Sequence, residues 1–202
     1  MSFQWIINKA AAISLNRKPV VASTQSRSGI VRTVSRGAAT WKIEVSLPEG
    51  LPWTEVRNDL AKAETLDRYT SSWIQLYTYE LNRYQGNSVN STGFVATINK
   101  GSNVINLTTS PSTPTGGFKF RAGDIIQLGY EGHCYAVAED VPYNAGSVTL
   151  HRPVLETSQA NINLYVGTSA RFNVVCRQFP NWTITQRNIV SWDGPFVFYE
   201  VI

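Results

Sequence analysis

The chain has 202 residues, of which 43% are hydrophobic and only 16% charged, so it can bury the core of one large or two small domains. Its apolar stretches are far shorter than the roughly 20 residues that a membrane span needs. The first 14 residues lack the basic start and compact apolar core of a signal peptide. We therefore expect no membrane segment and a protein that stays in the cytosol where it is made.

The first strong pattern in chain order has a period of two. Apolar and polar residues alternate over residues 30–36, and they alternate again over residues 39–47 after Gly37 and Ala38. In the second stretch Trp41, Ile43, Val45 and Leu47 fall on one face. We expect two adjacent strands joined by a tight turn at Gly37-Ala38, with one buried face.

A helix is expected next. Pro52 stands where a missing backbone N–H costs nothing, at the start of the helix. Apolar residues then recur at steps of three and four and form one stripe: Trp53, Val56, Leu60, Ala63 and Leu66. We expect this stripe to pack on the sheet that holds Trp41 and Ile43. A further strand is predicted over residues 73–79.

Short strands separated by turn residues fill the middle of the chain, from residue 86 to residue 165. Apolar runs at 94–98, 104–107, 125–128, 133–138 and 147–150 alternate with Gly-, Asn- and Pro-rich joints. Such short, regularly punctuated strands are typical of a small closed or half-closed barrel. More strand is expected at 169–176 and 196–202.

The resulting expectation is a mainly β protein with one α-helix. Residues 1–85 and 166–202 would form a discontinuous β domain, and residues 86–165 an inserted small β-barrel. An insert of this kind suggests an assembly subunit, whose core packs with its neighbours while the insert projects.

The residues that usually carry catalysis do not form a recognisable pattern. His133 and Cys134 are neighbours on a predicted strand, so their side chains point to opposite faces and cannot act as a nucleophile–base pair. His151 ends a strand, and Cys134 and Cys176 are expected to be buried apolar residues. With no ligand spacing for zinc and no phosphate-binding glycine loop, we expect no enzyme, no metal and no cofactor.

Charge is distributed unevenly along the chain. Residues up to Lys42 include seven basic and no acidic side chains, whereas the insert has four basic and five acidic ones. The basic segment could contact nucleic acid or an acidic surface, or its counter-charges could lie on a neighbouring subunit. The second interpretation is favoured because the segment lacks clusters of Lys and Arg.

Aromatic residues of the insert leave a further possibility open. The insert carries seven of them: Phe94, Phe118, Phe120, Tyr130, Tyr135, Tyr143 and Tyr165. Small barrels can bind sugars or single strands by stacking on exposed rings. A nearly neutral insert lacks the positive groove that a nucleic acid needs, so a saccharide is the better candidate.

The order of these pieces resembles the distal tail protein of long-tailed bacteriophages, which joins the tail tube to the tail tip or baseplate. The resemblance is carried by residues 32–36 with 41–45, the helix within 48–68, residues 120–128 and residues 146–150. In that family a discontinuous β domain forms the ring, and a barrel of the oligonucleotide/oligosaccharide-binding (OB) type is inserted as an outward appendage. The resemblance therefore implies an OB-like barrel at 86–165.

The resemblance also implies a location and partners. They would be a homohexameric ring in the virion tail, assembled in the host cytoplasm, that contacts the tail tube protein and the tail tip or baseplate hub and lets DNA pass without specific binding. We expect Arg32 and Arg36 at the subunit boundary, facing acidic residues of the neighbour such as Glu55, Asp59, Glu64 or Asp67. The alternative is a tail accessory protein that binds a saccharide or the host surface through the inserted barrel.

Overall fold

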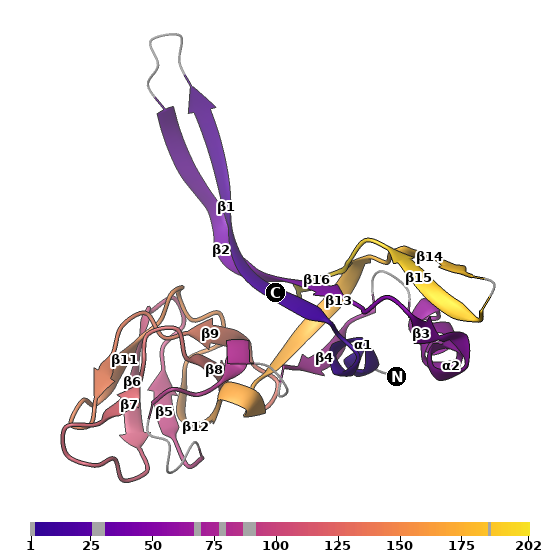
Figure 1. Cartoon of the computed structure of the whole chain (residues 1–202). Coiled ribbons are helices and arrows are strands. Elements are labelled where there is room, and N and C mark those ends of the chain that lie inside the picture. The colour runs from indigo at the N-terminus through magenta and orange to yellow at the C-terminus, as the bar shows by residue number, and fades with distance from the viewer. Residues whose placement is uncertain (1–2, 26–30, 67–69, 77–79, 87–91, 186) are drawn as a thin grey trace. The chain divides into compact units, whose positions relative to one another are not determined.

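The computed structural model describes residues 3–25, 31–66, 70–76, 80–86, 92–185 and 187–202, and for residues 18–25, 31–38 and 80 it describes the backbone alone. The protein is mainly β with one main helix, as the sequence predicts (Figure 1). Its chain divides into two compact units. The first unit combines Met1–Trp73 with Asn173–Val201, and the second comprises Ile74–Phe172 together with Ile202. The predicted insert, residues 86–165, lies within the limits of the second unit.

The first unit is built on a sheet with strand order β1-β2-β16-β13-β4, in which the first four strands are antiparallel. Its strands are Ala12–Gln25, Val31–Ser46, Phe196–Glu200, Arg171–Gln178 and Ser72–Gln75, the last two of which continue into the second unit. Strand β16 pairs with β2 on one side and β13 on the other, so the two chain segments share one sheet. The alternation predicted for residues 39–47 is confirmed: Trp41, Ile43, Val45 and Leu47 are all buried.

The predicted turn at Gly37-Ala38 is wrong. Strand β2 runs through both residues, and its hairpin partner is β1, with Gly37 opposite Val20 beside an irregularity in the register. The two alternating stretches are therefore one long strand, and the tight connection predicted between them is a bulge region. Helix α1 (Gln4–Asn8) precedes this hairpin and buries Ile6 and Ile7, which the sequence pattern did not predict.

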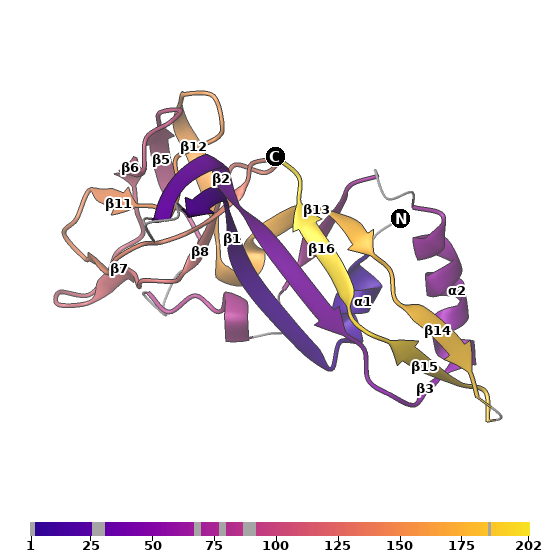
Figure 2. The same ribbon diagram turned by 90° about the horizontal axis from the view of Figure 1, so that it is seen from above.

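Helix α2 (Trp53–Glu64) carries four of the five residues of the predicted apolar stripe: Val56, Leu60 and Ala63 are buried and Trp53 is half-buried. The fifth, Leu66, lies beyond the end of the helix and is half-buried. Its neighbour is a small sheet of order β14-β15-β3 (Asn181–Ile184, Ile189–Asp193 and Leu51–Pro52), which Figure 2 shows beside the helix. Trp53 stacks on Trp182 of β14 with ring centroids 5.0 Å apart. At Trp53 the stripe therefore meets β14, a strand that the sequence pattern did not predict, and its predicted packing on the sheet of Trp41 and Ile43 stays a prediction.

The second unit is a curled antiparallel sheet with strand order β11-β6-β5-β12-β8-β9. Its strands are Ser147–Thr149, Val104–Thr109, Val95–Ile98, Gln159–Val166, Ile125–Leu128 and Cys134–Ala136. The Val137–Leu150 bridge joins the ends of the two outer strands, and Ala138 N–H donates to Thr149 O beside it (2.8 Å). A short pair, β7 (Phe118–Phe120) with β10 (Val141–Pro142), and two 3₁₀ turns, Glu80–Asn82 and Gly167–Ser169, complete the unit.

The curl of this sheet encloses one hydrophobic core. Three of the seven aromatic rings of the insert, Phe94, Phe120 and Tyr135, are fully buried in it. Both cysteines are free and buried, as expected, Cys134 in this unit and Cys176 in the first. Because most of the apolar side chains turn inward, the aromatic rings that remain exposed become the candidates for binding.

Candidate ligand-binding site

The turn between β8 and β9, residues 129–133, is stabilised by hydrogen bonds from a buried glutamine. The Nε2 of Gln127 donates to the carbonyls of Tyr130 (3.1 Å) and Gly132 (3.0 Å), and its Oε1 accepts from the backbone N–H of Arg171 (2.9 Å). Gln127 is completely buried, so leaving these groups unpaired would cost free energy. The glutamine therefore fixes the shape of the turn.

Two glycines allow this turn to be tight. Gly129 has φ +78°, in the left-handed region that glycine adopts most easily. A Cβ on Gly132 would collide with the carbonyl of Leu128 and lie 3.0 Å from Oε1 of Glu156. The spacing of the two glycines thus reflects a geometric need of the turn.

Glu156 connects the turn to the barrel core. Its Oε1 accepts hydrogen bonds from the backbone N–H (2.6 Å) and from Nδ1–H (2.9 Å) of His133, and its Oε2 accepts from the Tyr135 hydroxyl (2.6 Å). The Tyr135 oxygen in turn accepts from the N–H of Leu155 (2.8 Å). Both carboxylate oxygens are therefore occupied, and their arrangement fixes a loop.

The ionisation of this cluster follows from its geometry. Burial opposes the charged form of Glu156, but hydrogen bonds from His133 and Tyr135 outweigh it, and the pKa of Glu156 lies below its ordinary value. Burial, together with the hydrogen bond to Glu156, raises the pKa of Tyr135 far above the usual range for tyrosine. Glu156 is thus a carboxylate and Tyr135 a neutral donor at physiological pH.

Tyr130 stands at the tip of the turn and is 61% exposed, the highest value among the large apolar side chains that the structure describes. The guanidinium of Arg171 lies 3.7 Å from its ring centroid, and Nη2 of the same arginine donates to the Tyr130 carbonyl (3.0 Å). The ring of Tyr165 stands edge-on at 6.1 Å. Tyr130 is therefore an exposed ring that its neighbours hold in place.

A shallow hollow of about 500 Å³ lies beside the ring. Its wall combines apolar and polar groups and is formed by Leu128, Gly129, Tyr130, Glu131, Gly132, Glu156, Thr157, Gln159 and Ile162. An aromatic ring, a carboxylate, an amide and a hydroxyl side by side can bind a ligand through stacking and hydrogen bonds.

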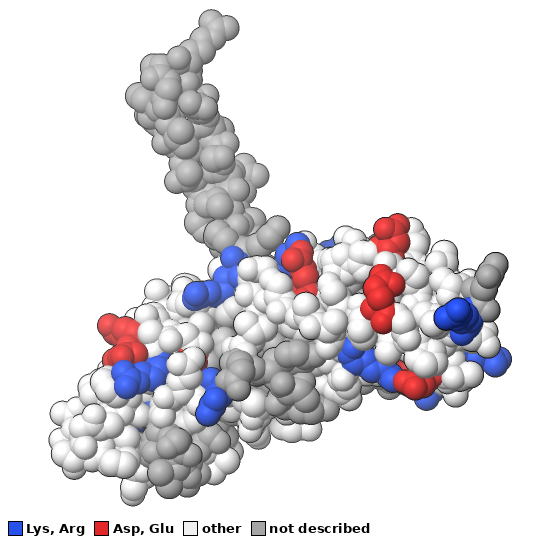
Figure 3. Space-filling view, viewed as in Figure 1, with Lys and Arg blue, Asp and Glu red and all other residues white. Residues whose placement is uncertain are grey.

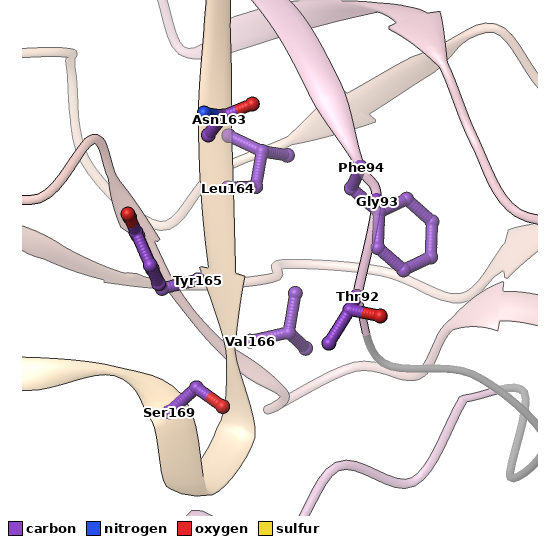
Figure 4. A pocket seen from close by; sticks show the side chains of 8 residues that line it. All are labelled: Thr92, Gly93, Phe94, Asn163, Leu164, Tyr165, Val166 and Ser169. Carbon is purple, nitrogen blue, oxygen red and sulfur yellow. The ribbon is translucent and has the colours of Figure 1, made fainter.

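A second pocket, of about 180 Å³, lies between β12 and the residues before β5. In Figure 4 Leu164 and Val166 lie on the side of β12 that faces Thr92 and Phe94, and Tyr165 lies on the other side. Phe94, Leu164 and Val166 are all core residues. This pocket is therefore one end of the barrel core and a weaker candidate than the hollow beside Tyr130.

The predicted ring-interface residues fall on different parts of the first unit. Asp59 is half-buried on α2. Arg32 and Arg36 lie in β2, where only the backbone is described, and Asp67 lies outside the described residues. Of these four side chains the structure therefore describes that of Asp59 alone, and the predicted interface stays a prediction.

Some charges expected to face a neighbour have partners in the same chain. Lys9 pairs with Glu55 (3.3 Å), and Glu64 accepts a hydrogen bond from the indole N–H of Trp182 (3.1 Å). Lys42 pairs with Glu44, and on the face seen in Figure 3 basic and acidic side chains of the described residues are interspersed. Part of the basic segment is therefore neutralised internally.

The sequence pattern did not identify the turn as a site. It placed His133 and Cys134 on opposite faces, and in the structure His133 bonds Glu156 while the Cys134 thiol donates to the carbonyl of Arg171 (3.1 Å). Two glycines close together between predicted strands are a signal for a tight turn, and this signal could have placed Tyr130 in a turn. Glu156, 23 residues further along the chain, could not be linked to His133 by spacing.

No family model matches the chain, and no curated protein matches its sequence. Among the described residues no helix is long and apolar enough to cross a membrane. The same residues contain no group of three or more His, Cys, Asp or Glu side chains placed to hold a metal ion.

Proposed function

We propose that the chain is a structural subunit of a bacteriophage tail, a distal tail protein that forms a hexameric ring between the tail tube and the tail tip or baseplate. The observation that carries the proposal is the interrupted first unit: β16 and β13 return after the second unit to pair beside β2. This arrangement of a split β unit around a barrel-like unit is the one that the resemblance implies.

The edge of the large sheet supports assembly. Strand β1 is the outer strand of the order β1-β2-β16-β13-β4 and is 14 residues long. Long open edges invite pairing with other chains, and a closed ring lets identical subunits cover one another's edges head to tail. We therefore place the subunit boundary at the β1–β2 hairpin.

Charge favours the same boundary. Lys9 and Lys42 are paired within the chain. The basic residues Arg32 and Arg36 belong to the distal part of β2, beyond its pairing with β16 at Lys42–Val45. In the ring they face the acidic residues Asp59 and Asp67 of the neighbouring α2 region. The ring surrounds an opening through which DNA passes without specific contacts, in a virion tail assembled in the host cytoplasm.

Charge reversal tests the boundary. The double variant Arg32→Glu/Arg36→Glu should lose the hexamer in native mass spectrometry while its circular dichroism spectrum stays that of the folded chain. Adding Asp59→Arg and Asp67→Arg should restore assembly, since attraction returns with the signs exchanged.

The matched control is Lys100→Glu, a charge reversal at an exposed position of the second unit, which is not part of the proposed boundary. This variant should assemble like the unmodified chain. A double variant that assembles as well as this control would exclude Arg32 and Arg36 from the boundary.

A further inference from the structure

We propose that the β8–β9 turn is a binding site for a neutral, hexose-based oligosaccharide, with Tyr130 as the stacking platform and Glu131, Thr157 and Gln159 as the hydroxyl-binding groups. The inference goes beyond ring formation and does not depend on it, because every residue involved belongs to the second unit.

The first argument is the exposed but fixed ring of Tyr130. Single exposed aromatic residues are common on protein surfaces and need no explanation by themselves. Here, however, the backbone carbonyl of Tyr130 accepts from both Gln127 and Arg171, and the guanidinium of Arg171 packs against the ring. A ring fixed before binding loses little entropy when a ligand stacks on it.

The second argument is the chemistry of the hollow beside the ring. Glu131, Thr157 and Gln159 are exposed and line it, and Leu128 and Ile162 supply an apolar floor. A pyranose presents an apolar C–H face and a rim of hydroxyl groups, so it can stack on the ring while carboxylate, amide and hydroxyl groups bond its rim.

The third argument is charge. Glu131 and Glu156 line the hollow, Glu156 is bonded to His133, and the guanidinium of Arg171 packs against the Tyr130 ring. A phosphate chain would meet Glu131, and a cationic ligand would find one face of the ring next to Arg171. A neutral ligand has neither conflict, which favours a saccharide over a nucleic acid or a basic peptide.

The test is calorimetric titration of the full-length chain with four neutral hexasaccharides: maltohexaose, cellohexaose, mannohexaose and chitohexaose. We expect at least one of them to bind with a Kd on the order of 1 mM or tighter. Tyr130→Ala should weaken that binding about tenfold or more, because it removes the stacking platform. Tyr130→Phe should keep most of the affinity, since the ring remains, and Gln159→Ala should weaken it.

Tyr143→Ala is the matched control, because Tyr143 is an exposed tyrosine of the same unit outside the hollow. Its affinity should equal that of the unmodified chain, with every variant unfolding at the same temperature. If none of the four hexasaccharides binds, or if Tyr130→Ala binds as tightly as Tyr143→Ala, the proposal is wrong.

Discussion

Glu156 shows how one carboxylate can organise a surface turn. It accepts hydrogen bonds from the backbone and ring of His133 and from the hydroxyl of Tyr135, which ties a partly exposed loop to a fully buried ring. Arg152, only 2% exposed, lies behind the same ring, with its guanidinium 4.9 Å from the Tyr135 centroid and its Nη2 donating to the Cys134 carbonyl. The exposed ring of Tyr130 therefore belongs to a turn that a hydrogen-bond network around Glu156 stabilises.

The lowered pKa of Glu156 makes a prediction about pH. A carboxyl whose folded pKa lies below its unfolded value, about 4.3, stabilises the fold above that pH and loses this contribution as pH falls through the folded pKa. Glu156→Gln should cost about 1–3 kcal/mol near neutral pH, because it removes the charged acceptor.

The measurement is urea denaturation of both proteins between about pH 7 and pH 3. The difference in unfolding free energy should shrink as the pH falls below about 4.3. A difference that stays constant over this range would show that Glu156 is not stabilised as an anion.

Among the elements, an apolar periodicity predicts the structure correctly where one face of the helix or strand is buried within the same chain. The stripe of α2 and the alternation at Trp41–Leu47 are periodic and buried, and both are predicted correctly. The hairpin is predicted wrongly because its true partner, β1, is an edge strand: Ile13 and Leu15 are only half-buried, and their apolar signal is weak. Because the sequence does not indicate β1 as the partner of β2, Gly37 is interpreted as the turn of a hairpin within β2.

The buried stripe of α2 gives a prediction about stability. Leu60 is 1% exposed, so Leu60→Ala should lower the free energy of unfolding by about 2–5 kcal/mol through lost burial and a cavity. Chemical denaturation measures the change. Arg57→Ala, on the exposed face of the same helix, is the control and should change stability by less than about 0.5 kcal/mol. A loss at Leu60 no larger than at Arg57 would mean that the stripe does not pack.

For the molecule as a whole, the sequence predicts that a separate unit interrupts the β domain, but it places the limits at residues 86 and 165. The second unit runs from Ile74 to Phe172. Ile74 and Leu76 are buried although no barrel strand is predicted there, and Gly167 packs closely against Tyr84. No change in composition marks either crossing, because each limit falls inside a strand, β4 (Ser72–Gln75) at one and β13 (Arg171–Gln178) at the other.

The same limit applies to function. Turn residues and aromatic counts predict a barrel with exposed rings, but only the fold shows which ring is exposed and which polar groups surround it. The proposed ring depends on contacts between subunits. In a single chain the only signs of such contacts are the uneven charge of the sequence and the edge strand β1 of the fold.

We propose that six copies of this chain close a ring at the end of a phage tail. The decisive experiment is cryo-electron microscopy of tails that contain the chain, averaged without imposed symmetry. We expect a six-fold ring at the distal end of the tube, with a central opening and with the β1–β2 hairpin at each subunit boundary. Tails in which the chain is present but shows no rotational symmetry would exclude the proposed ring.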